Sequence, residues 1–285
     1  MKNGETGKTM GNIRAVFHIG SVEFQRWMRS SRLTILGVML VFIHMQIIVT
    51  LQDCAVRMGK PVTILEAFVA LGNSGMIVLI LPALFLVLLS DFPQKGGIDF
   101  LYQMRCSKKT WMWGQILFAL EAVAFLVGFL IVSSCIMMST KGVWQMRFSD
   151  AVTYYSSTFP ERTGDYILQL LPENLYQQML FSTAVLHTIL MLFLYFFLLA
   201  MILLFAALCN RKSVGVLVDG ILIVMGTVGC SANAVWMWLF PMAHAIPWVH
   251  YEKYLRAQVF PIWGSYLYLA GSCGGLIVGC MFAAK

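Results

Sequence analysis

Charged residues are scarce in this chain of 285 residues: they make up 12% of it, whereas hydrophobic residues make up 59%. A soluble domain averages about 25% charged and about 45–50% apolar residues, and a soluble chain must cover its surface with polar groups. Together with a mean hydropathy of +0.78, the composition excludes an ordinary soluble protein. It indicates a chain whose surface is covered largely by lipid.

Several functional motifs are also missing. The 7 cysteines are scattered without a Cys-x-x-Cys pair, so the sequence indicates neither a disulfide framework nor a metal site. Residues 4–9 end like a phosphate-binding loop, but the spacing of their glycines is too short and no strand precedes them. We find no convergent nucleophile and base, and the small residues at 72–75 are better explained by helix packing. The sequence therefore predicts no enzyme activity by itself and no directly bound cofactor.

Long apolar segments recur along the chain. A spanning helix needs roughly 20 mostly apolar residues, and helices are the default choice because lipid cannot satisfy free backbone N–H and C=O groups. We predict an all-α, polytopic membrane protein with a single transmembrane domain over residues 1–285. Its six predicted spans are 33–51, 69–89, 113–138, 180–208, 214–240 and 262–283. Residues 139–179 and 241–261 form the predicted outer loops, with short helices at 168–180 and 249–257.

The 20 lysine and arginine residues are unevenly distributed between the span ends. More of them lie in the N-terminal segment, in the loops after the second and fourth spans and at the C-terminus than in the other loops. Because cytoplasmic loops carry an excess of Lys and Arg, we expect a multi-pass protein of the cell membrane with both termini in the cytoplasm. The net charge of +7 then follows mostly from topology, and we expect membrane lipid but no nucleic acid as a partner.

The segment before the first span has an amphipathic helical pattern. Basic and polar side chains occupy its other faces, and a tryptophan lies near its end, which is typical of a helix in the membrane interface. We therefore predict an interfacial helix over residues 12–31. Its apolar face consists of Ile13, Phe17, Gly20, Phe24 and Trp27.

The loop between the second and third spans, residues 92–111, contains helix breakers and then a short helical pattern. Pro93 and the pair Gly96-Gly97 end the preceding helix. Residues 98–105 can form a short helix, and Ser107 is a candidate N-cap for the helix of the third span. The sequence thus predicts a short cytoplasmic helix held between two spans.

With an interfacial helix, six spans and this loop, the chain resembles the permease subunit of a type-2 ABC exporter. In that family an acidic residue ends the second span, followed by a basic residue, Gly, a short apolar helix, a Ser/Arg-type turn, and Gly-Lys at the third span. The matching residues are Asp91, Lys95-Gly96-Gly97, Ile98 to Met104, Ser107-Lys108-Lys109 and Gly114-Gln115. The chain departs from the pattern in having Asp91 for the more usual Glu, an inserted Pro93, and Gln115 for Lys.

The resemblance implies a mechanism and partners. In such exporters the loop helix docks on a separate ABC ATPase subunit, which binds the ATP, and a second permease copy or a homologous permease completes the membrane unit. A short helix held between two spans transmits a push, whereas a floppy loop does not. The implied ATPase-coupling residues are Ile98, Phe100, Leu101, Tyr102, Met104 and Arg105.

Two carboxylates, Glu121 and Asp219, lie inside predicted spans, roughly 8–12 Å from their cytoplasmic ends at 1.5 Å per residue. Intramembrane carboxylates usually face the bundle interior and mark function. These two could line an inward cavity on a translocation path, bind a cationic substrate, or pair with Arg211 or Lys212. The alternative is a buried structural hydrogen bond or a side chain that reaches toward the interface.

Gly271, Gly275 and Gly279 lie on one face of the sixth predicted span. Their spacing permits close approach of another helix, either within the chain or across a dimer.

Other function classes remain open from the residues alone. One is a secondary carrier, which should show inverted repeats and broken helices, and we detect no convincing repeat. Another is an accessory or scaffold subunit without ATPase coupling. The substrate is not indicated, because fold does not fix function.

Overall fold

The computed structural model of the chain describes residues 2–94, 106–252 and 258–284. It is all-α, with 78% helix. The only described strands are short: β1 (Val62–Thr63) pairs in parallel with β2 (Gly142–Val143). The all-α prediction is confirmed.

Five helices of the described chain are long and apolar enough to cross a membrane. They are Ser31–Met58, α7 (Lys108–Met138), α12 (Phe181–Leu208), α13 (Lys212–Ser231) and α15 (Ile262–Ala283). The first consists of η1 (Ser31–Leu33), α2 (Thr34–Ile43), a π-helical turn η2 (His44–Ile48) and α3 (Val49–Met58). It continues past the predicted end at residue 51 until Gly59, which adopts a left-handed φ of 61°. A multi-pass membrane protein is supported, with α12 packed against α7, α13 and α15.

The predicted second span, 69–89, is not one continuous helix. It is divided into α4 (Glu66–Asn73) and α5 (Gly75–Leu88) by Ser74, whose φ and ψ of −81° and 120° are extended. Every residue of α4 is buried, so the interruption lies inside the protein rather than against lipid, as backbone polarity at membrane depth requires. The predicted span over 69–89 is therefore divided, so the structure supports five long spans rather than six, and the small residues at 72–75 mark the break.

The fifth span is shorter than predicted, because α13 ends at Ser231 rather than continuing to residue 240. Asn233 adopts a positive φ of 52°, and the chain then forms the 3₁₀ helix η4 (Val235–Leu239) and α14 (Pro241–Ala245). Pro241 occupies the first turn of α14, where its missing N–H costs nothing. The apolar segment 214–240 is long enough for a span, but the turn at Asn233 ends the helix within it.

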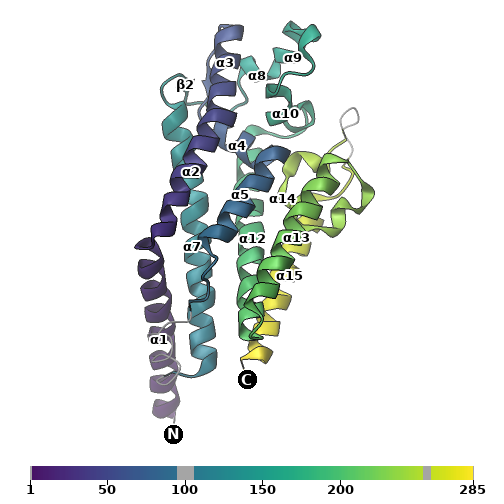
Figure 1. Cartoon of the computed structure of the whole chain (residues 1–285). Coiled ribbons are helices and arrows are strands. Elements are labelled where there is room, and N and C mark those ends of the chain that lie inside the picture. The colour runs from purple at the N-terminus through teal and green to yellow at the C-terminus, as the bar shows by residue number, and fades with distance from the viewer. Residues whose placement is uncertain (1, 95–105, 253–257, 285) are drawn as a thin grey trace.

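The N-terminal helix α1 (Lys2–Met28) is longer than predicted and packs along the first half of α7 (Figure 1). Its buried face contains Ile19, Glu23 and Trp27, whereas Ile13 and Phe17 are exposed. A Cβ at Gly114 of α7 would lie 2.5 Å from the Ile19 side chain, so the two helices touch where glycine permits it. The predicted apolar face is therefore corrected: Gly20 and Trp27 belong to it, Ile13 and Phe17 do not.

Short helices gather at one end of the bundle, opposite the first turn of α1 and the last turn of α15 (Figure 1). We call residues 139–180 and 232–252 the cap, and this end the cap end; the other is the terminal end. The cap contains α8 (Asp150–Thr153), α9 (Tyr155–Thr158), η3 (Pro160–Arg162), α10 (Ile167–Leu170), α11 (Glu173–Tyr176), η4, α14 and η5 (Pro247–His250). The predicted helix at 168–180 is thus two short helices. Of the predicted helix at 249–257, residues 253–257 lie outside the described residues.

Close packing at the break gives a first prediction. A Cβ at residue 72 would overlap the Thr188 side chain of α12, so Gly72→Ala should lower the free energy of unfolding by about 1–3 kcal/mol through overpacking. Gly128→Ala in α7 is the matched control, since nothing lies within 4 Å of its Cβ position. Thermal unfolding in detergent measures both. Equal melting temperatures for the two variants would contradict the packing at Gly72.

Candidate functional site

The loop predicted to couple to an ATPase begins at a junction of α1, α5 and α7. The Trp27 indole donates a hydrogen bond to the Leu88 carbonyl at 3.1 Å, which ties the end of α5 to the end of α1. Phe92 is 4% exposed, and its ring centroid lies 5.1 Å from that of Phe118 on α7. Arg32 forms an ion pair with Asp91. The loop therefore leaves α5 from a fixed position.

The far end of the same loop is also fixed. Ser107 is the N-cap of α7, and its hydroxyl accepts a hydrogen bond from the Thr110 backbone N–H at 3.2 Å. A second contact of 2.8 Å joins the two hydroxyl groups. The predicted cap is confirmed. The predicted coupling residues Ile98, Phe100, Leu101, Tyr102, Met104 and Arg105 lie outside the described residues.

The two intramembrane carboxylates are placed differently and are not brought together. Glu121 on α7 is partly exposed, and its Oε2 has no hydrogen-bond partner. Asp219 on α13 is completely buried, and neither of its carboxylate oxygens has a hydrogen-bond partner among the described residues. Asp219 therefore makes no hydrogen bond with Arg211 or Lys212. The hydroxyl of Tyr195 on α12, also 0% exposed, lacks a partner too.

The three glycines of α15 do not share one role. Gly279 packs within the chain, since a Cβ there would lie 3.1 Å from the Phe205 ring of α12. Nothing described lies within 4 Å of a Cβ at Gly271 or Gly275. These two glycines leave an open face on α15.

At the cap end, Glu66 joins the start of α4 to the loop after α7. Its two oxygens accept hydrogen bonds from the backbone N–H groups of Thr63 at 2.9 Å and Ser149 at 2.5 Å. Thr63 and Glu66 have the spacing of a capping box. Burial raises the pKa of Glu66 to about 7, although these hydrogen bonds act in the opposite direction.

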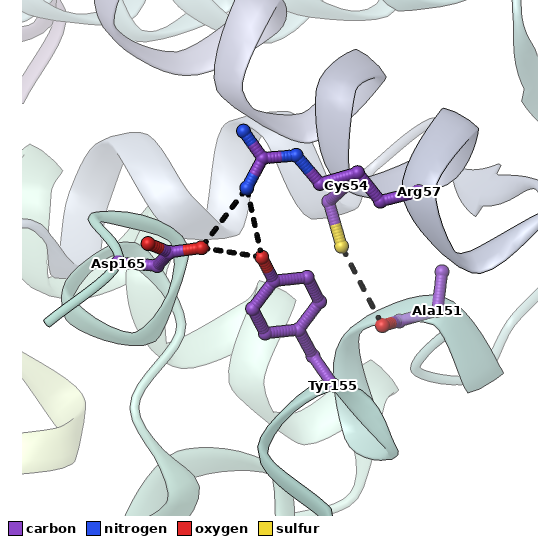
Figure 2. A network of polar contacts seen from close by, with 5 residues as sticks. All are labelled: Cys54, Arg57, Ala151, Tyr155 and Asp165. Carbon is purple, nitrogen blue, oxygen red and sulfur yellow. Dashed lines mark hydrogen bonds and ion pairs between the residues drawn. The ribbon is translucent and has the colours of Figure 1, made fainter. Parts of the chain in front are cut away.

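Figure 2 shows a second connection of the cap, between the end of the first span and the cap helices. The Arg57 guanidinium lies 3.0 Å from the Asp165 carboxylate and 3.2 Å from the Tyr155 hydroxyl, which itself donates to Asp165 at 2.5 Å. The Cys54 thiol donates to the Ala151 carbonyl at 3.5 Å. Because the Arg57 and Asp165 side chains are 45% and 32% exposed, the ion pair contributes little energy and chiefly orients the loop.

A third connection was not foreseen from the sequence: two histidines of the cap converge on Ser265 of α15. His244 Nδ1 and His250 Nε2 each lie 2.7 Å from the Ser265 oxygen. His244 Nε2 donates to the Trp238 carbonyl at 2.8 Å, and His250 Nδ1 donates to the Ile246 carbonyl at 3.0 Å. Those carbonyls accept only, so each neutral imidazole presents its other ring nitrogen to Ser265 as an acceptor. The single Ser265 hydroxyl proton can be donated to only one of the two nitrogens at a time.

This cluster is a hydroxyl between two bases, the arrangement that a serine nucleophile needs. The sequence did not indicate that a serine and two histidines would meet, and the structure brings these three side chains into contact. Ser265 and His250 are 0% exposed and His244 is 1% exposed, so no substrate reaches the hydroxyl in this conformation. The spacing of the three residues in the sequence matches no common motif, and only their contact reveals them.

A cavity of about 680 Å³ lies in the cap beside this cluster. Trp238, Trp248 and Tyr251 contribute aromatic walls, and Glu173 and Asn174 contribute polar groups. Its volume suits a small organic molecule. Among the described residues, no group of three or more His, Cys, Asp or Glu side chains is arranged to hold a metal ion.

Comparison with known proteins adds no relative: no family model, no curated protein and no solved structure matches the chain.

The buried histidines give a pH prediction. Burial lowers the pKa of His250 from 6.5 to about 4, so the native imidazole is neutral while the unfolded chain takes up a proton below pH 6.5. The contribution of His250 to stability is then complete above pH 6.5 and is lost as the pH drops toward 4, by up to about 3 kcal/mol. Because the raised pKa of Glu66 acts in the opposite direction over the same range, this contribution is read as the difference between the wild type and a His250 variant. Thermal unfolding between pH 4 and 8 measures this.

The variant His250→Gln should flatten that pH dependence, although His244, whose pKa burial also lowers, contributes a remainder. His44→Gln, at an exposed position of η2, is the matched control for the replacement of a histidine by glutamine. A pH dependence of stability in His250→Gln that is identical to that of the wild type would refute the assignment.

Proposed function

We propose that the chain is the membrane-spanning permease subunit of an ATP-driven ABC exporter, coupled to a separate ATPase subunit. The observation that supports this best is the fixation of the loop between α5 and α7 at both of its ends. Trp27, Phe92 and the Arg32–Asp91 pair hold one end, and the Ser107 cap holds the other. A segment anchored in this way can pass a displacement to two spans at once.

The position of α1 gives further support. Helix α1 packs on the half of α7 that follows the loop, and its last turn bonds to the last turn of α5. A displacement of the loop therefore acts on α1 together with α7 and, through the Trp27–Leu88 hydrogen bond, on the end of α5. In this proposal the ATPase binds the ATP, a second permease completes the membrane unit, and both termini lie in the cytoplasm.

A secondary carrier is the second candidate. The break at Ser74 is the kind of discontinuity that carriers use around a binding site, and Asp219 is a buried carboxylate without a hydrogen-bond partner. The missing internal repeat argues against a carrier. A third candidate, an accessory or scaffold subunit, needs neither the fixed loop nor the buried carboxylate.

The coupling prediction concerns Leu101 and Tyr102. Affinity purification of the tagged chain from its native membrane should co-purify a subunit with a complete phosphate-binding loop, and nanodiscs holding the complex should hydrolyse ATP. Leu101→Asp and Tyr102→Asp place a charge in an apolar contact and should weaken that association at least about tenfold. Membrane insertion should be intact.

Trp144→Asp, at a 63% exposed position of the cap end, is the control and should retain the ATPase. Undiminished co-purification with both loop variants would reject the loop as the docking segment. A wild-type chain that transports without any ATPase partner would instead support the carrier.

A further inference from the structure

Three of the five buried residues of α13 are glycines, and one of the other two is a carboxylate. The five are Gly215, Asp219, Ile223, Gly226 and Gly229, which share one side of the helix. A Cβ at Gly215 would lie 2.6 Å from Ala206 of α12, and one at Gly226 would lie 2.6 Å from Met242 of α14. Asp219 is thus placed against closely packed neighbours rather than toward lipid.

Tyr195 of α12 completes this arrangement. Both side chains are 0% exposed, they lie on helices that pack against each other, and their three oxygen atoms have no hydrogen-bond partner among the described residues. Buried polar atoms in native structures nearly always have a partner, and an isolated buried carboxylate is especially costly. Three unpartnered oxygens in one part of the bundle therefore point to an absent ligand.

No described neighbour supplies the missing positive charge. Helix α13 packs against α5, α12 and α14. Helix α5 contains no charged residue, His187 of α12 bonds to Tyr266, and His244 of α14 bonds to Ser265 and Trp238. Lys212, on α13 itself, is seven residues from Asp219, about 10 Å along the helix axis.

We propose that Asp219 and Tyr195 form a binding site for a monovalent cation within the membrane bundle. Oxygen ligands suit hard cations, and one carboxylate balances one positive charge. A proton, an alkali metal ion and a primary ammonium group share this chemistry. The role of this site in transport rests on the proposed transport function. Cation binding itself does not, because it is measurable on the isolated chain.

The site is closed in this conformation, so exchange of the cation requires α13 to move relative to α12. The opposite face of α13 is lined by exposed apolar residues, among them Leu217, Ile221 and Val224. That face slides against lipid without losing specific contacts. Binding of a cation at Asp219 would then favour the packed arrangement of α12 and α13.

The test is thermal unfolding of the purified chain in uncharged nanodiscs with choline chloride, NaCl, KCl or methylammonium chloride at equal ionic strength, each from pH 5.5 to 8.5. A bound cation raises the melting temperature with the logarithm of its concentration. We expect one small cation to do so in the wild type and not in Asp219→Asn. Tyr195→Phe should shift the concentration dependence about tenfold, the effect of one lost ligand.

Each outcome is decisive. A rise of the melting temperature on acidification in choline alone, absent in Asp219→Asn, identifies the proton, and a response to sodium, potassium or methylammonium identifies that class. Glu161→Gln, at an exposed position of η3, is the control and should respond like the wild type. If Asp219→Asn does not fold, Tyr195→Phe carries the test.

A wild type that ignores every cation and pH, or shares its whole response with both variants, overturns the site. That failure is distinct from failure of the ATPase proposal, because co-purification depends on the loop at residues 98–105 and not on Asp219.

Discussion

The break in the helix at Ser74 imposes the constraint on which the rest of this fold depends. Where α4 ends, backbone groups lose their helical partners, and lipid cannot replace them. The Asn73 carbonyl accepts a hydrogen bond from the Trp248 indole at 2.6 Å, and the Asn73 amide donates to Val69 and Thr188. One residue therefore joins α4, α12 and the cap. Without these hydrogen bonds of Asn73, the interrupted span would expose unpaired backbone groups inside the membrane.

Apart from the Trp27–Leu88 and Arg32–Asp91 contacts where α1 meets α5, the other polar connections described above lie at the cap end and stabilise the same region. Glu66 fixes the start of α4, the Arg57–Asp165–Tyr155 contact holds the first span to the cap, and Ser265 ties two cap histidines to α15. Each connection joins segments far apart in the sequence. Hydrogen bonds and an ion pair therefore connect the segments of the cap end, whereas the helices toward the terminal end pack mostly through apolar and small residues.

The sequence allowed prediction of those features that depend on local pattern. Apolar run length located the helices now seen as α7, α12 and α15, and the Ser107 cap followed from one residue before an apolar run. The break at Ser74 could not be foreseen, because its stabilising partners Trp248 and Thr188 are distant in sequence. The apolar face of α1 was misplaced for a similar reason: Gly114 and Leu117 of α7 decide which side is buried.

The candidate functional residues also differ in whether local sequence pattern could reveal them. A buried carboxylate is visible in sequence because an acidic residue interrupts an apolar run, so Asp219 was identified. The Ser265 cluster was missed because each of its residues is unremarkable where it stands, and only tertiary contact brings the three together.

The uneven distribution of these hydrogen bonds and ion pairs bears on the mechanism of both leading candidate functions, the exporter and the carrier. An exporter and a carrier both require the bundle to change shape, and motion concentrates where fewest specific contacts must break. The hydrogen bonds of the cap end oppose such a change of shape there. Toward the terminal end, the loop between α5 and α7 is the proposed contact with the ATPase, and the proposed cation site at Asp219 lies where α13 packs against α12. Opening at the terminal end while the cap holds the helices together is thus the movement that this arrangement of contacts favours.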